Sequence, residues 1–407
     1  SHVTADYSTS DVLFTVTPDA TAFDPSEFDL HDIAIESRKA RENLYQARAD
    51  YTLPLEALGE DGFIKFGAKW IDRRKVNDEE SVSYDFNGDL TLAQAQRGSR
   101  ASLYGGRYPF GPLVDVNALY SHFAAHPDEF EVDDDATLAD SLAGDYHLSE
   151  KIYAGYVMAN LKVGDLTLIP GVRVERTVGD YRGKSITPTS TLDQGFDQIV
   201  KKSYTDVFPG LNARYDFTPE VVFRAAVTTA IGRPDYAQLA PFVSINVPDE
   251  EVSMGNPDLK PLKSVNFDAS LEYYIPNHRG LLSAAVFHKE IKHPIYTSSD
   301  HIPDGVFAGI ALQDALVEQP FNADDAKVTG LELNAQLELS FLPSPLDGFG
   351  VNVNGTFIKS KVSGVPGHPD DTPLFGQSDR VASAQVYYEK YGFSARLAYS
   401  YRSSYLL

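Results

Sequence analysis

One tripeptide in this sequence has residue types that could hold a phosphate group. Gly183-Lys184-Ser185 matches the last three residues of a phosphate-binding loop, in which backbone amides and a lysine surround the phosphates. The first glycine of that loop would fall at Val178, and no helical pattern follows the segment. We therefore reject a nucleotide site. The sequence also lacks the Gly-x-Ser-x-Gly motif of many serine hydrolases.

Metal chemistry has two candidate positions. His122 and His126 have the i, i+4 spacing of a zinc-binding helix, but no glutamate adjoins His122 and the helical pattern there is weak. A run of carboxylates could offer oxygen ligands to Ca²⁺, but it lacks the spacing of a calcium loop, so we interpret it as a solvated loop. The chain has no cysteine. We expect no metal, no cofactor and no catalytic residue, and hence no enzyme. The carboxylates of this run are Asp128, Glu131, Asp133, Asp134, Asp135 and Asp140.

The charge balance excludes one class of partner. The 35 lysine and arginine residues against 58 aspartate and glutamate residues give a formal net charge of −23. Because phosphate backbones require a basic surface, we expect no nucleic-acid partner. No stretch approaches the roughly 18 apolar residues of a transmembrane helix, although that test does not detect transmembrane strands.

The elements that must position any functional side chain are strands. Apolar residues at 331, 333, 335, 337, 339 and 341 alternate with polar residues at 332, 334, 336, 338 and 340, and the same period of two recurs at 264–274, 349–357 and 393–402. Such strands have one apolar and one polar face. A soluble sandwich would bury the apolar face in a core, whereas a membrane barrel would turn it to lipid.

Connection lengths favour the barrel. Short links near 56–61, 164–165, 218–220, 276–280, 342–348 and 390–392 alternate with long links near 74–148, 178–200, 232–261, 292–326 and 362–378. Outer-membrane barrels have short periplasmic turns and long extracellular loops. We therefore predict an all-β chain of about thirteen strands that forms an antiparallel transmembrane β-barrel.

Five segments resemble one family of such barrels. They read VVFRAAVTTAIGRPDYAQLAP at 221–241, GNPDLKP at 255–261, GLLSAAVFHKEIKHPI from 280, LPSPLDGFGVNVNGTF from 342 and YYEKYGFSARLAYSYRSSYL from 387. Their order and spacing are similar to those of TonB-dependent outer-membrane receptors, more narrowly the subgroup common in Caulobacter- and Xanthomonas-like bacteria. The similarity covers most of the chain and is strongest after Leu211.

The resemblance implies a Gram-negative outer-membrane protein in contact with lipid. Complete receptors of this family have 22 strands, a plug domain and a segment that contacts the TonB energy-transducing complex in the periplasm. We expect this chain, residues 1–407, to be the C-terminal portion of the barrel, with the plug outside the sequence. Gating and energy coupling then lie beyond these residues.

Two features of the sequence predict candidate functional residues: the alternation of apolar and polar residues along the strands, and the position of aromatic residues in the long loops. Polar side chains on the non-lipid face should point to the barrel lumen, where most would brace the barrel. Aromatic side chains in the long loops could stack on a ligand. The lumen candidates are Lys65, Arg173, Arg224, Asp268, Glu332, Asn334, Gln336 and Arg396, and the ligand candidates are Tyr84, Tyr104, Tyr108, Phe110, Tyr120, Tyr236, Tyr296 and Phe307.

The resemblance leaves the imported nutrient open. Residues 124–145 contain no lysine or arginine, and such an acidic loop would repel anionic ferric siderophores. Because neutral oligosaccharides stack on aromatic rings without that penalty, the sequence leans towards a carbohydrate ligand. A ferric siderophore receptor of the same family is the alternative. A passive porin and a secreted soluble β-rich glycan-binding protein are alternatives from other classes.

Overall fold

The computed structural model describes residues 3–6, 15–18, 23–98, 102–103, 108–109, 111–247, 250–365 and 371–406. The chain divides into two compact units. The first comprises Ser1–Lys39, Asp78–Asp145 and Pro188–Asp193, and the second comprises Ala40–Asn77, Tyr146–Thr187 and Gln194–Leu407.

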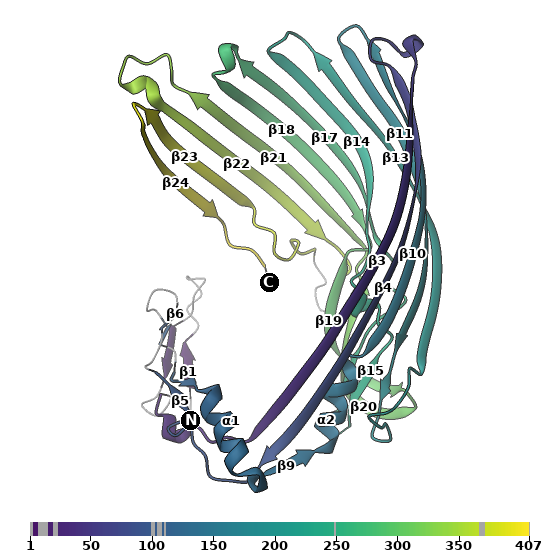
Figure 1. Ribbon diagram of the computed structural model, residues 1–407, viewed down its shortest axis with the longest axis vertical. Helices are drawn as coiled ribbons and strands as arrows, with labels where there is room; N and C mark the ends of the chain where they lie inside the picture. The colour runs from purple at the N-terminus through teal and green to yellow at the C-terminus, as the bar shows by residue number, and fades with distance from the viewer. Residues whose placement is uncertain are drawn as a thin grey trace. The chain divides into compact units, whose positions relative to one another are not determined.

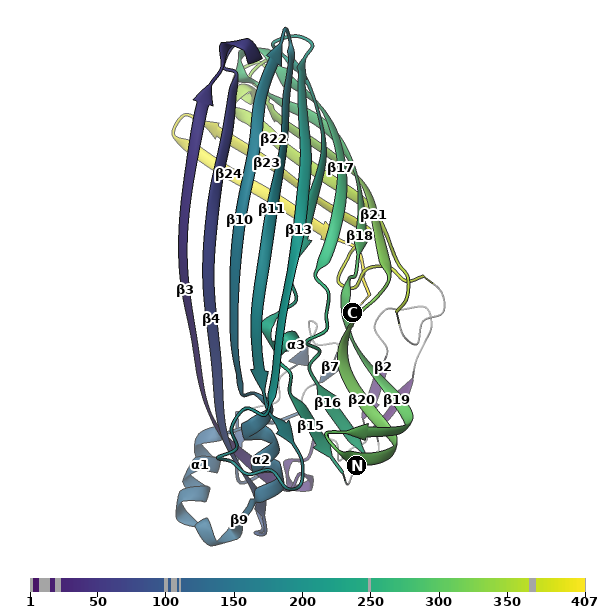
Figure 2. The ribbon, with the colours of Figure 1, turned by 90° about the vertical axis from the view of Figure 1, so that its right-hand side faces the viewer.

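The second unit contains most of a strand meander (Figure 1). Within the described residues the main sheet has thirteen strands, of which twelve pair in chain order and β9 (Phe130–Asp133) adds a short pairing to β4. Figure 2 shows the first of the twelve side by side. The twelve are β3 (Asp32–Pro54), β4 (Phe63–Phe86), β10 (Tyr146–Val163), β11 (Leu166–Gly183), β13 (Gln198–Asp216), β14 (Val221–Gly232), β17 (Leu262–Ile275), β18 (Gly280–Lys292), β21 (Asp325–Glu338), β22 (Phe349–Val362), β23 (Arg380–Lys390) and β24 (Phe393–Arg402).

The period of two in the sequence becomes two chemically different faces. On β21, Leu331 and Leu333 point to one face and remain 37% and 44% exposed to the surroundings, while Glu332 and Asn334 point to the other. Exposed large apolar side chains recur on the first face of β4, β10, β17, β22 and β24. Because no protein core covers this face among the described residues, its natural solvent is lipid. The predicted antiparallel membrane barrel wall is confirmed.

Short turns join the strands at one end of the sheet. They span 55–62, 164–165, 217–220, 276–279, 339–348 and 391–392. Asp61, Gly164, Asn277 and Gly392 adopt positive φ values of 58°, 59°, 63° and 74°, which tight reversals require. The meander therefore reverses within a few residues at this end.

The connections at the opposite strand ends are long, and the structure shifts several of their predicted bounds. The link predicted at 74–148 spans 87–145, because β4 continues to Phe86, and that predicted at 178–200 spans 184–197. The link predicted at 292–326 is mostly a hairpin of β19 (Ile295–Phe307) and β20 (Ile310–Asn322). The remaining two span 233–261 and 363–379.

The long connections of the second unit fold into a sheet of their own. β12 (Ser185–Ile186), β15 (Val243–Asn246), β16 (Glu251–Met254), β20 and β19 pair in that order. Ile245, Val252, Leu312, Ala315 and Val317 form its buried core. These connections are therefore structured by apolar burial.

The described residues of the first unit include two α-helices, α1 (Val116–Ala125) and α2 (Asp134–Ala143). The Asp133 side chain caps α2 by accepting from the Ala136 amide at 2.9 Å, so the acidic run predicted as a loop is partly helical. The Thr137 and Ser141 hydroxyls of α2 accept from the backbone amides of Ser83 and Ser81. No helix among the described residues is both long and apolar enough to cross a membrane.

Candidate functional site

All eight lumen candidates lie on one face of the main sheet. Residues directly opposite each other in neighbouring strands have side chains on the same face of the sheet. Followed strand by strand from β4 to β24, the pairing registers place Lys65, Arg173 and Arg396 on one face. This polar face lies opposite the exposed apolar face. Its position in a barrel lumen remains a prediction.

The structure brings some of these candidates together. Arg224, Asp268 and Glu332 line one hollow of the polar face, and Gln336 and Arg396 line another. The Arg224 Nε donates to a Glu272 carboxylate oxygen at 3.0 Å. Arg224 is thus held by a carboxylate of the same face, which fits a bracing role.

A buried ionic network lies towards the long-loop end of the polar face. The Glu175 carboxylate accepts from Arg233 Nη2 at 2.7 Å and from Arg173 Nε at 2.6 Å. Arg233 Nη2 also donates to the Thr177 hydroxyl at 3.1 Å, and Glu150 nearby is only 4% exposed. Charges buried to this extent are stable only when they are paired, so the network fixes the start of loop 233–261 on β11.

Tyr236 stands beside this network on the short helix α3 (Tyr236–Leu239). The Arg73 guanidinium and the Lys75 ammonium lie 6.0 Å and 5.9 Å from the centre of its ring. Burial raises the pKa of Tyr236 to about 12. An aromatic ring next to two cations at the long-loop end of the polar face can hold an anionic or aromatic group.

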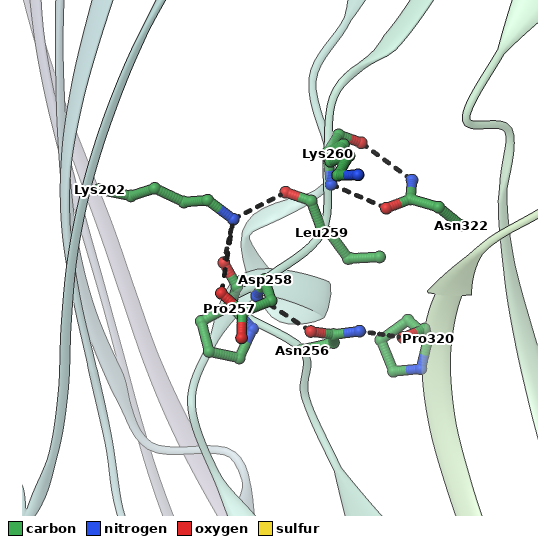
Figure 3. A network of polar contacts seen from close by, with 8 residues as sticks. All are labelled: Lys202, Asn256, Pro257, Asp258, Leu259, Lys260, Pro320 and Asn322. Atoms are coloured by element: carbon green, nitrogen blue, oxygen red, sulfur yellow. Dashed lines mark hydrogen bonds and ion pairs between the residues drawn. The ribbon is translucent and has the colours of Figure 1, made fainter.

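Segment 255–261 carries the GNPDLKP motif and is fastened to the wall by a lysine of β13 (Figure 3). Lys202 Nζ donates to the Pro257 carbonyl at 2.9 Å and to the Leu259 carbonyl at 3.2 Å, and Asp258 lies 3.8 Å away. Leu259 itself is 2% exposed and packs with Leu148. The Lys202 ammonium thus supplies hydrogen bonds to two backbone carbonyls of this segment, which contains two prolines.

The same segment is also fastened to the following long connection. Asn256 Nδ2 donates to the Pro320 carbonyl at 2.9 Å, and the Asn322 side chain accepts from the Lys260 amide at 2.8 Å (Figure 3). Pro320 and Asn322 belong to β20. The loops 233–261 and 293–324 are therefore linked to each other through the motif.

The remaining ligand candidates of the second unit serve loop packing in this structure. The Tyr296 ring lies 5.0 Å from the Phe375 ring, edge to face, and 6.3 Å from the Phe321 ring. Phe307 packs against the core of the five-stranded sheet. Their roles in ligand binding stay predictions.

The candidates of the first unit are placed differently. The Tyr84 ring lies 5.1 Å from Phe123, edge to face, while Tyr120 on α1 is 56% exposed. Tyr104 and Phe110 lie outside the described residues, as does the side chain of Tyr108.

The histidine pair does have a helix and a carboxylate, contrary to the weak helical pattern. His122 lies on α1, and its Nε2 is 2.8 Å from Glu129 Oε2, while His126 Nδ1 is 3.8 Å from the other carboxylate oxygen. The two imidazole rings stack with centres 4.7 Å apart. Across the described ranges, no group of three histidine, aspartate or glutamate side chains is arranged to hold a metal ion.

Sequence reasoning missed the residues that organise the long-loop end. Glu150, Lys202 and Arg233 were not among the candidates. The Arg233 and Glu175 partners are 58 residues apart, and Lys202 and Pro257 are 55 apart. No pattern near Arg233 in the sequence indicates Glu175, because a charged residue at the end of a strand is usually exposed to solvent.

These features define a class of protein, an outer-membrane barrel wall with a structured loop end. The family model "TonB dependent receptor-like, beta-barrel" matches residues 3–406. The chain therefore belongs to the TonB-dependent receptor β-barrel family, whose members are outer-membrane proteins of Gram-negative bacteria. Family members are receptors and transporters rather than enzymes.

Similar proteins agree with this assignment at the level of the fold. The unliganded ferric citrate transporter FecA has a TM-score of 0.57 at 14% identity, covering 92% of this chain and 43% of that one. The alcaligin receptor FauA of Bordetella pertussis has a TM-score of 0.50 at 13% identity, covering 90% of this chain and 47% of that one.

One similar sequence is the probable hemoglobin and hemoglobin-haptoglobin-binding protein 4 of Haemophilus influenzae. It is 30% identical over 112 residues, which are 27% of this chain and 11% of that protein. This chain spans less than two thirds of the length of each of these three relatives.

Proposed function

We propose that this chain forms part of the wall of a TonB-dependent receptor that imports a scarce nutrient across the outer membrane. The observation that carries the proposal is the meander itself, with an exposed apolar face, a polar face, tight turns at one end and structured loops at the other. A lipid-embedded wall around a polar passage requires this combination. The short turns are then periplasmic, the long loops extracellular, and the TonB complex is the periplasmic partner.

We infer that the nutrient is an anionic iron chelate, the siderophore alternative. The carbohydrate preference rested on the lack of positive charge in the loops, and the comparisons give it no support. Arg73 and Lys75 supply cations next to the Tyr236 ring, at the long-loop end of the polar face. The partial similarity to a haemoglobin-binding protein also favours iron uptake. The finer subgroup resemblance remains a proposal.

Uptake by the receptor in its native outer membrane tests the function. We expect the receptor to take up a radiolabelled ferric siderophore. Deletion of TonB should stop this uptake, and neutral oligosaccharides should not compete with the siderophore. Substituting Lys75→Glu should weaken binding of the chelate, because it reverses a charge beside Tyr236. Lys162→Gln is the matched control, since Lys162 pairs with Glu60 at 2.9 Å at the short-turn end.

Three results would contradict the proposal. Competition by an oligosaccharide, with no uptake of any ferric chelate, would restore the carbohydrate ligand. Protease cleavage of intact cells within 217–220, combined with protection of 87–145, would reverse the orientation. Uptake that is independent of TonB would indicate a passive porin.

A further inference from the structure

The apolar face of β4, β10, β11 and β13 is ordered in rows by the strand registers. Phe66, Val157 and Val172 stand in one such row, and the row two residues further contains Val174 and Val207. The rows consist of exposed apolar side chains, with Val207 58% exposed. This part of the wall is the lipid-facing band.

An aromatic row lies on the same face, on the side of the long loops, where the basic side chains begin. Trp70 lies opposite Tyr153, and both side chains are exposed on the lipid face. Amphipathic aromatic rings gather where hydrocarbon gives way to headgroups. The row of Trp70 and Tyr153 therefore marks the depth of the headgroups on this side of the wall.

Basic side chains begin at that row and continue beyond it on the same outward face. We call them the basic patch, and its five cations are Arg74, Lys151, Arg176, Arg182 and Lys201. Two carboxylates, Asp72 and Asp180, lie among them. Five cations and two carboxylates leave a formal charge of +3, on a chain whose total is −23.

The patch is hollowed and only partly neutralised. Arg74 pairs with Asp72 at 3.0 Å and Arg182 pairs with Asp180 at 2.8 Å, while Lys201 stands 3.9 Å from Asp180. Arg74, Lys151, Arg182 and Lys201 line one hollow. The arginine and lysine groups thus surround a space in which an anion can make several charge-assisted hydrogen bonds.

We propose that the basic patch binds the phosphate groups of a phosphorylated glycolipid in the outer leaflet of the membrane. The patch faces lipid, begins at the headgroup depth, and has the charge that complements a phosphate. The long-loop side is the extracellular side only under the proposed function, so the identity of the leaflet rests on that proposal. A lipid held here would connect β4, β10, β11 and β13, and the last two of these strands carry Glu175 and Lys202.

Native mass spectrometry of the receptor released from membranes tests the patch. We expect phosphorylated lipid A to remain bound, and lipid A with its phosphates removed to be lost. The double variant Lys151→Gln, Lys201→Gln should bind the phosphorylated form at least tenfold more weakly. The double variant Lys65→Gln, Lys69→Gln removes the same charge from the polar face of β4 and should bind like the wild type.

Other results would overturn the proposal. Equal retention of both lipid A forms, or equal weakening in both double variants, would show that the patch does not recognise phosphate. Equal binding of phosphatidylglycerol or of inorganic phosphate would show a general anion surface instead of a glycolipid site. The measurement needs neither nutrient nor TonB, so a failure of the import proposal would leave its result unchanged.

Discussion

The two ends of the main sheet are stabilised in different ways. At the short-turn end, Gly164 and Gly392 reverse the chain through positive φ values, and few side chains of the turns are buried. At the long-loop end, Tyr181, Leu239 and Leu259 are almost fully buried in one apolar cluster. The first end depends on local backbone geometry, whereas the second depends on packing between segments far apart in the sequence.

This difference separates a structural end from a functional one. The residue types in a two-residue turn are restricted by the backbone angles that the turn requires. Such a turn therefore offers few side chains that could bind a ligand. A loop with its own core can present Tyr236 and its neighbouring cations in fixed positions. Rigid support of exposed groups is what a binding site requires.

The largest expected effect is the loss of a buried side chain at the long-loop end. Leu259→Ala should lower the free energy of opening of loop 233–261 by about 2–5 kcal/mol, because it leaves a cavity among Leu148, Tyr181 and Leu239. Hydrogen exchange of the loop amides measures this. Leu346→Ala, at a turn residue that is 46% exposed, is the control and should change little. Equal effects at both ends would show that the long-loop end depends on packing no more than the short-turn end does.

Between the two ends, the effect of introducing a charge should depend on whether the residue lies on the apolar face or on the polar face of the sheet. Leu333→Arg places a charge on the lipid side and should cost about 2–4 kcal/mol near the midplane of the bilayer. Asn334→Arg, one residue along and on the polar face, should be tolerated. The yield of folded, heat-modifiable protein in the outer membrane measures both. If both variants insert equally well, the faces have been assigned wrongly.

The lysine that fastens segment 255–261 should have an intermediate effect. Lys202→Met removes the donor to two carbonyls and should cost about 1.5–3 kcal/mol of local stability. Limited proteolysis between 250 and 262 measures the loosening. Lys162→Met, at a side chain of the short-turn end that is 38% exposed, is the control. Unchanged proteolysis of the Lys202 variant would mean that the apolar cluster alone holds the segment.

The sequence was sufficient for the features that depend on near neighbours. Strand faces follow from a period of two, so the sides of Leu333 and Asn334 could be predicted. Turn positions follow from residues such as Gly164, whose backbone freedom is a local property. β19 was predicted as a loop because its polar run at 297–301 hides the alternation. The helix α1 was missed for a similar reason, since its helical pattern is weak.

The candidate site was harder to predict because its contacts are not local. Tyr236 was found from its residue type and loop position, but nothing near it in the sequence indicates Arg73 or Lys75, which reach it from β4. The pairing of Arg233 with Glu175 depends on how three strands are placed side by side. Only the register of the sheet brings such residues together.

The smallest expected effect is a difference in stability between alanine variants of two glycines, both of which have open space around them. A Cβ added at Gly164 or at Gly195 would meet no heavy atom within 4 Å, but Gly164 has a φ of +59° whereas Gly195 has none in the left-handed range. Gly164→Ala should therefore cost about 1 kcal/mol through backbone strain alone, and Gly195→Ala, in a long loop, should be neutral. Urea-induced unfolding of the two variants in detergent measures the difference. A larger loss for Gly195→Ala would show that backbone freedom matters more in the loops than in the turns, which would reverse the comparison of the two ends.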